Sequence, residues 1–449
     1  LRINGVKVEL DEIKALLPAD IIRIEFHDNP GLRYRNAEVV LDYIVRRPET
    51  GGNFSVDMSQ GVNALWGEHR VSGKINHKKS EFGASYRIGP RDFYGMSRDN
   101  EEIFHLADGT VLHRKETGDP SHASMFMHNL NLNYSVQDPE KYLFNATFRY
   151  WNNHQPHWDY RGILSNLDNP NDYVDMVDLN SSDNQVPALD LYYQRNLKND
   201  QTLVFNVVGT YNRTSSHRFY QESWGEELLT DINNRVSGKK YSLIGEAIYE
   251  KKLANGNSLS GGVWHTQSFS DNEYRNGHDY DTHMDQSASS IYGEFKGKVR
   301  KLDYMLGVEL ARLYYKQEGT DDSDQFYTFN PRFTLQYALP GQSFIRLKGY
   351  VGNLSPSLGN LNAVEQVIDS LQLQRGNPRL ESYMSYLLDL NYEYQKGIFY
   401  ALVNGTYEYV PNAIMDEKYQ EGNKIIQTWN NQKNWQRVVG SAMFRVGPI

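Results

Sequence analysis

The chain has 449 residues, enough for several ordinary domains or for one large β-architecture. Apolar residues make up only 39% while aromatic residues reach 13%, a balance that suits a protein with one apolar and one wet face better than a soluble enzyme. The net charge of −9 argues against nucleic acid as a partner, and the lack of Cys excludes disulfides, thiolate metal sites and Cys nucleophiles.

Residues 1–48 predict a small αβ element. Asn4-Gly5 marks the turn of a hairpin within residues 1–10, because this dipeptide favours the tight turns that join two strands. Asp11 is placed to cap a helical turn that ends at Pro18, and strands are expected at 21–26 and 37–47. An element this small cannot bury enough surface to fold alone, so it must pack against another part of the protein.

From about Phe54 onward the dominant period is two. In residues 128–136 Leu and Tyr alternate with Asn and Ser, and residues 386–394 repeat the pattern with Leu and Tyr against Asp, Asn and Glu. Such alternation predicts strands with one apolar and one polar face. The segments run to about 10–14 residues, which matches the 9–11 residues of a tilted membrane-crossing strand better than the five or six of a soluble sandwich.

The connections between these segments alternate between short and long. Short turns are expected at 77–81, 137–141, 196–200, 253–257, 299–301, 339–342, 395–397 and 430–434. Long irregular stretches are expected at 94–123, 153–186, 214–238, 270–285, 317–325, 353–382 and 411–422. This is the layout of an outer-membrane barrel with about seventeen strands, its turns periplasmic and its loops extracellular. A large soluble β-protein is the less favoured alternative, because a polar inner face would be costly in a dry core.

Two stretches carry candidate binding residues. The first could stack a sugar, a peptide or a haem-like ligand, or could simply be an aromatic girdle and loop; it contains Trp151, His154, His157, Trp158 and Tyr160. The second could hold a divalent metal, although a hydrated loop is the favoured interpretation; it contains His278, Asp279, Asp281, His283 and Asp285. No catalytic motif is present, so neither an enzymatic activity nor a cofactor is expected.

Two regions resemble a known family. Residues 4–47 are similar to the second half of the plug domain of TonB-dependent outer-membrane receptors, although Asn29-Pro30 stands where the plug pattern has Gly-Pro. Residues 329–383 and 428–435 resemble the barrel of the branch of this family common in Bacteroidetes. The clearest barrel motif comprises Gly376, Asn377, Pro378, Leu380 and Glu381.

The resemblance implies an all-β membrane protein, a large antiparallel transmembrane β-barrel with a small αβ plug fragment in its lumen. Residues 1–50 would be the C-terminal part of the plug and residues 51–449 the barrel. The family barrel has about 22 strands, so about five would follow Ile449. The first half of the plug, a TonB box and a signal peptide would precede Leu1.

The resemblance also implies contacts between plug and barrel. In the family, an Arg and a Glu at the positions of Arg23 and Glu25 face charged residues of the barrel wall, and Arg46 and Arg47 close the plug. Such hydrated ion pairs would hold the plug yet break under force. Plain solvated strand charge is the alternative.

The expected function is energy-coupled import of a scarce extracellular ligand across the outer membrane of a Gram-negative bacterium. The expected partners are outer-membrane lipid, the TonB-ExbB-ExbD complex, a small-molecule, peptide or glycan ligand, and a surface lipoprotein. The alternative function is a non-transporting barrel that acts as a surface adhesin or as a structural or assembly module.

Overall fold

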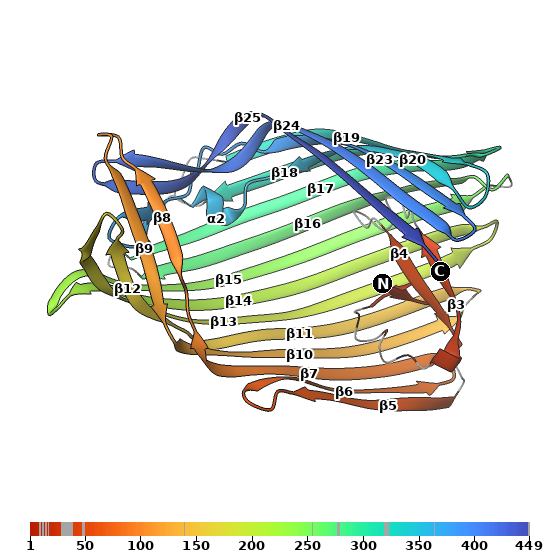
Figure 1. Ribbon diagram of the computed structural model, residues 1–449. Coiled ribbons are helices and arrows are strands. Elements are labelled where there is room, and N and C mark those ends of the chain that lie inside the picture. Colours follow the sequence, from red (N-terminus) through yellow and green to blue (C-terminus); the bar gives the residue numbers. More distant parts are fainter. Residues whose placement is uncertain are drawn as a thin grey trace.

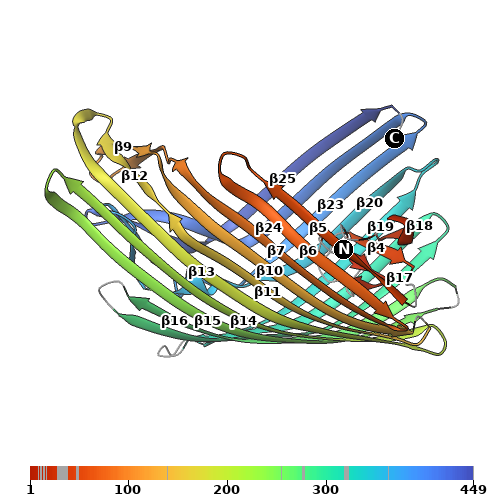
Figure 2. The ribbon, with the colours of Figure 1, turned by 90° about the horizontal axis from the view of Figure 1, so that it is seen from below.

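The computed structural model describes the chain except for residues 9, 11, 12, 14, 15, 17, 28–38, 47–49, 139, 254, 276–278, 318–322, 363 and 448–449. Almost all of its elements are strands, which form one four-stranded and one 21-stranded sheet. The large sheet curls around the small one (Figure 1, Figure 2). None of the described helices has the length and apolar character needed to cross a membrane.

The small sheet contains the predicted hairpin and both predicted strands. Its elements are β1 (Arg2–Ile3), β2 (Val6–Lys7), the 3-10 turn η1 (Pro18–Asp20), β3 (Ile21–His27) and β4 (Val40–Val45). Asn4 and Gly5 both take positive φ, at 49° and 85°, as a tight two-residue hairpin turn requires. The strands lie in the order β2-β1-β4-β3, with β1 parallel to β4. The helical turn expected from Asp11 falls largely outside the described residues.

The large sheet begins at residue 50. Its strands are β5 (Thr50–Gln60), β6 (Leu65–His77), β7 (Ser80–Met96), β8 (Asn100–His105), β9 (Val111–Asp119), β10 (Ser121–Asp138), β11 (Tyr142–Trp158), β12 (Tyr160–Asn166), β13 (Asn169–Leu197), β14 (Gln201–Trp224), β15 (Glu227–Lys252), β16 (Ser258–Arg275), β17 (Tyr280–Val299), β18 (Leu302–Gln317), β19 (Ser323–Ala338), β20 (Phe344–Leu354), β21 (Gln366–Val367), β22 (Gln372–Gln374), β23 (Tyr383–Lys396), β24 (Phe399–Glu421) and β25 (Lys424–Val446). One short helix, α2 (Leu358–Leu361), lies between β20 and β21.

Sixteen of these strands form a continuous antiparallel meander within the described part of the chain. They are β5, β6, β7, β10, β11, β13 to β20, β23, β24 and β25. Seven of the eight predicted short turns lie between consecutive strands at one end. The fold class is therefore the predicted one, a large antiparallel barrel sheet.

The two faces of the wall differ as the alternation predicts. On β10, Leu132 is 43% exposed, whereas Asn131 and Ser135, which occupy positions of the opposite face, are 8% and 1% exposed. On β23, Leu388 and Leu390 are likewise exposed. The apolar side chains thus point outward and the polar ones inward, the reverse of a soluble protein and the arrangement of a barrel in lipid.

Most of the long stretches predicted to be irregular are strand, which corrects that expectation, whereas residues 353–382 are mostly irregular, as predicted. Residues 214–238 belong to β14 and β15 and are interrupted only at 225–226, and β13 is 29 residues long. These strands continue beyond the membrane band with polar residues on both faces. Because a strand wetted on both sides shows no period of two, the sequence pattern could not reveal them.

The predicted turn at 430–434 and loop at 411–422 are also wrong. Residues 424–446 form one strand, β25, which pairs with β24 in a single register. Asn434 takes a φ of 61° opposite Pro411, and the pairing continues on both sides of it. The polar run around Lys433 therefore resembled a turn, and the extra turn raised the expected strand count from sixteen to about seventeen.

The small sheet and the long connections occupy opposite ends of the barrel. The small sheet lies within the curve of the wall at the end of the short turns (right in Figure 1), whereas α2, β8, β9 and β12 lie at the other end. The wall thus encloses the segment that resembles a plug.

Candidate ligand-binding site

The segment between β20 and β23 folds back onto the barrel wall at the long-loop end. Ser357 caps α2 by accepting a hydrogen bond from the Asn360 backbone N–H, and β22 pairs in parallel with the start of β25. Leu361 and Leu380 are 3% and 1% exposed and pack with Met284 of β17. The loop is therefore a packed layer rather than a free extension.

The motif from Gly376 to Glu381 holds this loop in place. The backbone N–H groups of Gly376 and Asn377 donate to the carbonyls of Asn362 and Asn360, at 2.9 and 2.6 Å. The Asn377 side chain donates to the Trp429 carbonyl at 3.0 Å. Asn431 Oδ1 accepts from the Glu381 backbone N–H at 2.9 Å. The two stretches that resemble the receptor barrel, 376–381 and 428–435, therefore bind one another.

A cluster of charges lies beneath the tip of the loop. Asp178 of β13 is only 3% exposed and accepts hydrogen bonds from Arg218 at 2.8 Å and from Arg98 at 3.4 Å. Arg98 also donates to Glu116 at 2.8 Å and lies 4.1 Å above the Tyr160 ring. A buried carboxylate bound by two guanidinium groups is firmly positioned, because leaving either charge unpaired would be costly.

The loop tip is bound to this cluster. Arg218 donates to the Ile368 carbonyl at 2.9 Å, and the Ser370 N–H donates to Glu222 at 3.2 Å. Arg114 of β9 pairs with Asp369 at 2.6 Å. Burial opposes ionisation of Asp369, but hydrogen bonds and charge attraction from Arg114 outweigh it, so the pKa of this carboxyl lies below its usual value.

The pKa of Glu116 is shifted in the opposite direction from that of Asp369. Burial is the largest influence on this carboxyl and outweighs its bond to Arg98, so its pKa is raised. The pKa of each of these two carboxyls thus depends on its own burial and on its own charged partner.

A polar cavity of about 480 Å³ lies between the loop and the wall. It is lined mainly by amide and hydroxyl groups, with one guanidinium and one imidazole; its wall residues are Gln155, Asn180, Ser181, Ser182, Ser216, His217, Arg218, Asn234 and Val236, and its loop residues are Gln366, Val367, Ile368 and Gln374. Its size is that of a small-molecule site. Such a lining can bind a hydrophilic ligand through many hydrogen bonds.

The five predicted ligand-loop residues do not form one site. Trp158 donates to the Tyr160 hydroxyl at 2.9 Å, and Tyr160 packs against the buried cluster of Leu164, Met176, Tyr220 and Ile232 beside Arg98. His154 pairs with Asp183 at 3.4 Å. Trp151 lies in β11, paired with Asn129. His157 stacks on His122 instead.

The predicted metal residues lie on a hairpin. Asp279 and Asp281 pair with Arg275, at 3.7 and 2.6 Å, and His283 contacts Asp271. Asp281, His283 and Asp285 belong to β17, while His278 lies outside the described residues. The hypothesis of a metal here stays a prediction.

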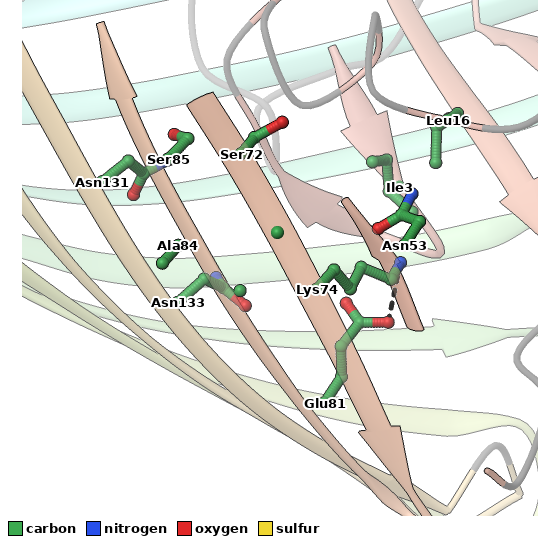
Figure 3. Close-up of a pocket in the computed structure, with 12 residues that line it drawn as sticks. Ile3, Leu16, Asn53, Ser72, Lys74, Glu81, Ala84, Ser85, Asn131 and Asn133 are labelled. Atoms are coloured by element: carbon green, nitrogen blue, oxygen red, sulfur yellow. Dashed lines mark ion pairs between the residues drawn. The ribbon is translucent and has the colours of Figure 1, made fainter. Parts of the chain in front are cut away.

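The small sheet contacts the wall through residues that the sequence did not single out. Ile3 and Leu16 line a small cavity with Asn131 and Asn133 on the inner wall, beside the 2.8 Å pair of Lys74 and Glu81 (Figure 3). Arg2 and Lys7 line a second cavity with Arg149 and Asp190, and both attract the Asp190 charge.

The predicted plug residues make other contacts. Arg23 and Glu25 pair with each other at 2.6 Å and are 60% and 36% exposed. The Arg46 backbone N–H donates to the Asp20 carbonyl, and Arg47 lies outside the described residues. Wall contact by these four residues remains a prediction.

Comparison with known proteins identifies the architecture. Residues 264–448 match the outer membrane protein beta-barrel family. Three similar solved structures are the copper transporter OprC, the Serratia marcescens hemophore receptor HasR and the Pseudomonas aeruginosa siderophore receptor PirA. Their TM-scores are 0.63, 0.59 and 0.56, with sequence identities of 10%, 10% and 12%. No curated protein matches the sequence.

The chain covers only part of these structures. The alignments include 90%, 90% and 99% of this chain but 60%, 63% and 77% of OprC, HasR and PirA. The fold is therefore that of TonB-dependent receptor barrels over most of the chain, and its C-terminal part matches a family of outer-membrane β-barrels.

Proposed function

We propose that this outer-membrane β-barrel, which has the fold of TonB-dependent receptors, captures a scarce hydrophilic ligand outside the cell and imports it by energy-coupled movement of the plug. The proposal rests on two features that lie at opposite ends of the lumen. A segment that resembles a plug lies at the end of the short turns, and a polar cavity of about 480 Å³ lies under an inward-folded loop at the other end.

The lining of the cavity and of the inner wall supports capture of a ligand and its passage through the barrel. The cavity lining combines many amide and hydroxyl groups with the apolar side chains of Val236, Val367 and Ile368, so the ligand class is a polar small molecule, a glycan or a short peptide. The ferric enterobactin receptor PfeA of Pseudomonas aeruginosa, another structure with this fold, is in complex with enterobactin, and HasR is in complex with its hemophore and heme. The inner wall below the cavity is lined by Asn, Thr and charged residues, and such polar side chains keep the lumen hydrated.

The contacts of the small sheet suit a movable element. Arg2 and Lys7 lie beside the wall charges Arg149 and Asp190, and the cavities at this interface, of about 80 and 90 Å³, leave its packing incomplete. Charge attraction across incompletely packed cavities is weaker than in a close, buried ion pair, so these contacts separate more easily. In this proposal the TonB-ExbB-ExbD complex supplies the force through a segment preceding Leu1, and a surface lipoprotein assists capture.

A binding experiment tests the capture step. The protein purified in detergent is titrated with ferric enterobactin, maltohexaose and triserine, and binding is followed by quenching of Trp fluorescence. We expect saturable binding of one probe that weakens at least tenfold in His217→Ala and Gln366→Ala, whose side chains line the cavity from opposite sides. His128→Ala on β10, outside the cavity, is the control. Equal affinity in all variants would place the ligand elsewhere.

A further inference from the structure

One group of metal-ligating side chains lies apart from the polar cavity. The ligand atoms of His122, His157 and Asp159 all lie within 4.8 Å of one another, and no other set of three such residues converges in this way within the described part of the chain. His122 and His157 stack with ring centroids 4.5 Å apart. His157 Nδ1 lies 3.4 Å from Asp159 Oδ2.

The backbone fixes this arrangement. β10 and β11 pair so that Ser124 faces His157, and the Asp159 N–H donates to the His122 carbonyl at 3.0 Å. The register shifts between Ser124 and Phe126, where β11 carries an extra residue. The bulge returns His157 to the face that His122 occupies, because an inserted residue reverses the alternation of side chains.

Two further residues position His122. Asp92 of β7 lies 2.8 Å from its Nε2, and the Tyr94 ring stacks on it at 4.4 Å with an interplanar angle of 6°. A carboxylate bound to one imidazole nitrogen orients the ring and makes the other nitrogen a better donor, as in many metal sites. The arrangement therefore contains both candidate ligands and a supporting carboxylate.

The cluster lies on the outer surface of the barrel. Tyr94 and Asp92 share the face of Phe82 and Tyr86, both of which are exposed apolar side chains of β7. Tyr94 is twelve residues beyond Phe82, or about 40 Å along the strand at 3.3 Å per residue. Because the apolar band of such barrels is about 25 Å tall, the cluster lies at its long-loop rim and outside the lumen.

We propose that His122, His157 and Asp159 bind one divalent metal ion of the Zn²⁺ or Cu²⁺ class, with Asp92 as a positioning residue. Two imidazole nitrogens and one carboxylate oxygen suit these ions, whereas Ca²⁺ and Mg²⁺ prefer oxygen alone. Ligand atoms around a tetrahedral Zn²⁺ are about 3.3 Å apart, a spacing that small side-chain rotations reach from 4.8 Å. The ion joins β10 to β11 next to the bulge and is not transport cargo, because the site faces away from the lumen.

Metal titration tests the proposal. The full-length protein in detergent is stripped with EDTA and titrated with ZnCl₂ by calorimetry. We expect a site of one ion per chain that is lost in the double variant His122→Ala/His157→Ala and weakened about tenfold or more in Asp92→Asn. His128→Ala, on the same face of β10 and bonded to Tyr86, is the matched control and should bind as the unmodified protein does.

Two readouts keep the test valid if a variant folds poorly. Cu²⁺ bound to the unmodified protein should show two nitrogen couplings in its electron paramagnetic resonance spectrum. Zn²⁺ should also protect His122 and His157, but not His128, from modification by diethyl pyrocarbonate, as read by mass spectrometry. Unchanged Zn²⁺ binding in the folded double variant, or equal modification of all three histidines with and without Zn²⁺, would overturn the proposal and leave these residues as ion pairs only.

Discussion

Leu390 and Asn391 are neighbours on β23 that point to opposite sides of the barrel wall. Leu390 is 49% exposed, whereas Asn391 donates a hydrogen bond to Asn404 on the inner face. Leu390→Arg places a charge in lipid and should lower the free energy of unfolding by about 2–4 kcal/mol near the midplane. Asn391→Arg should lower it far less, because the lumen is wet. Urea unfolding in lipid vesicles measures both, and equal losses would show that the faces are wrongly assigned.

Asp369 connects the loop between β20 and β23 to the wall through Arg114. Asp369→Asn removes a buried charge partner, so opening of the loop should become easier by about 1–3 kcal/mol. Trypsin cleavage after the exposed Arg379 reports this opening and should accelerate about tenfold or more. Asp168→Asn, which alters an exposed pair with His113, should leave the cleavage rate unchanged.

The pH dependence of this effect follows from the direction of the shift. The pKa of Asp369 is lowered when the loop is docked, so its contribution is complete above the ordinary Asp value of about 3.9 and is lost as the pH falls through the lowered value. The difference in cleavage rate between the unmodified protein and Asp369→Asn should therefore be constant near pH 7 and shrink in acid. Pepsin, which is active below pH 4 and cleaves beside apolar residues such as the buried Leu380, extends the measurement of loop opening into acid. A difference that grows in acid would contradict the assignment.

At the scale of elements, the motif from Gly376 to Glu381 joins the loop to β24 and β25. A Cβ on Gly376 would lie 2.2 Å from the Asn362 carbonyl oxygen and 2.8 Å from that of Asn360, so the backbone must move. Gly376→Ala should destabilise the loop by about 1–3 kcal/mol. The measurement is the temperature at which the folded band disappears on a gel. Gly359→Ala, whose Cβ would meet only Ser357 Oγ at 3.9 Å, is the control and should not change it.

Sequence patterns predict the strand segments that cross the membrane better than the strand segments that extend beyond it. Alternation identified the faces of β10 and β23, and Asn4-Gly5 identified the first hairpin, because each rests on residues close in sequence. The extensions of β13, β14 and β15 carry polar residues on both faces and gave no periodic signal. The motif at Gly376 was visible by resemblance, yet its contacts with Asn362 and Asn431 depend on the tertiary fold.

Local sequence patterns also do not show which residues meet in the candidate binding sites. His122 and His157 belong to different strands, and only the strand pairing with its bulge brings them together. The sequence grouped His157 with Trp158 and Tyr160, but consecutive side chains of a strand point to opposite faces, so these neighbours belong to different surroundings. The polar cavity is lined by residues from 155–236 and from 366–374, and no local sequence pattern shows that these two segments lie together.

At the scale of the whole molecule, the small sheet lies within the curve of the barrel wall at the end of the short turns, and the loop between β20 and β23 packs against the wall at the other end. A passive barrel would need neither the small sheet nor an energy source. The assignment to the Bacteroidetes branch and the wall contacts of Arg23, Glu25, Arg46 and Arg47 stay predictions.

Uptake in living cells tests the central claim most directly. Cells that express the gene encoding this chain are given radiolabelled ferric enterobactin, maltohexaose or triserine, with and without an uncoupler that dissipates the proton gradient. We expect that uptake of the probe that binds the purified protein requires the gene and stops with the uncoupler, while surface binding persists. Gene-dependent uptake that continues at the same rate without the proton gradient would contradict this expectation.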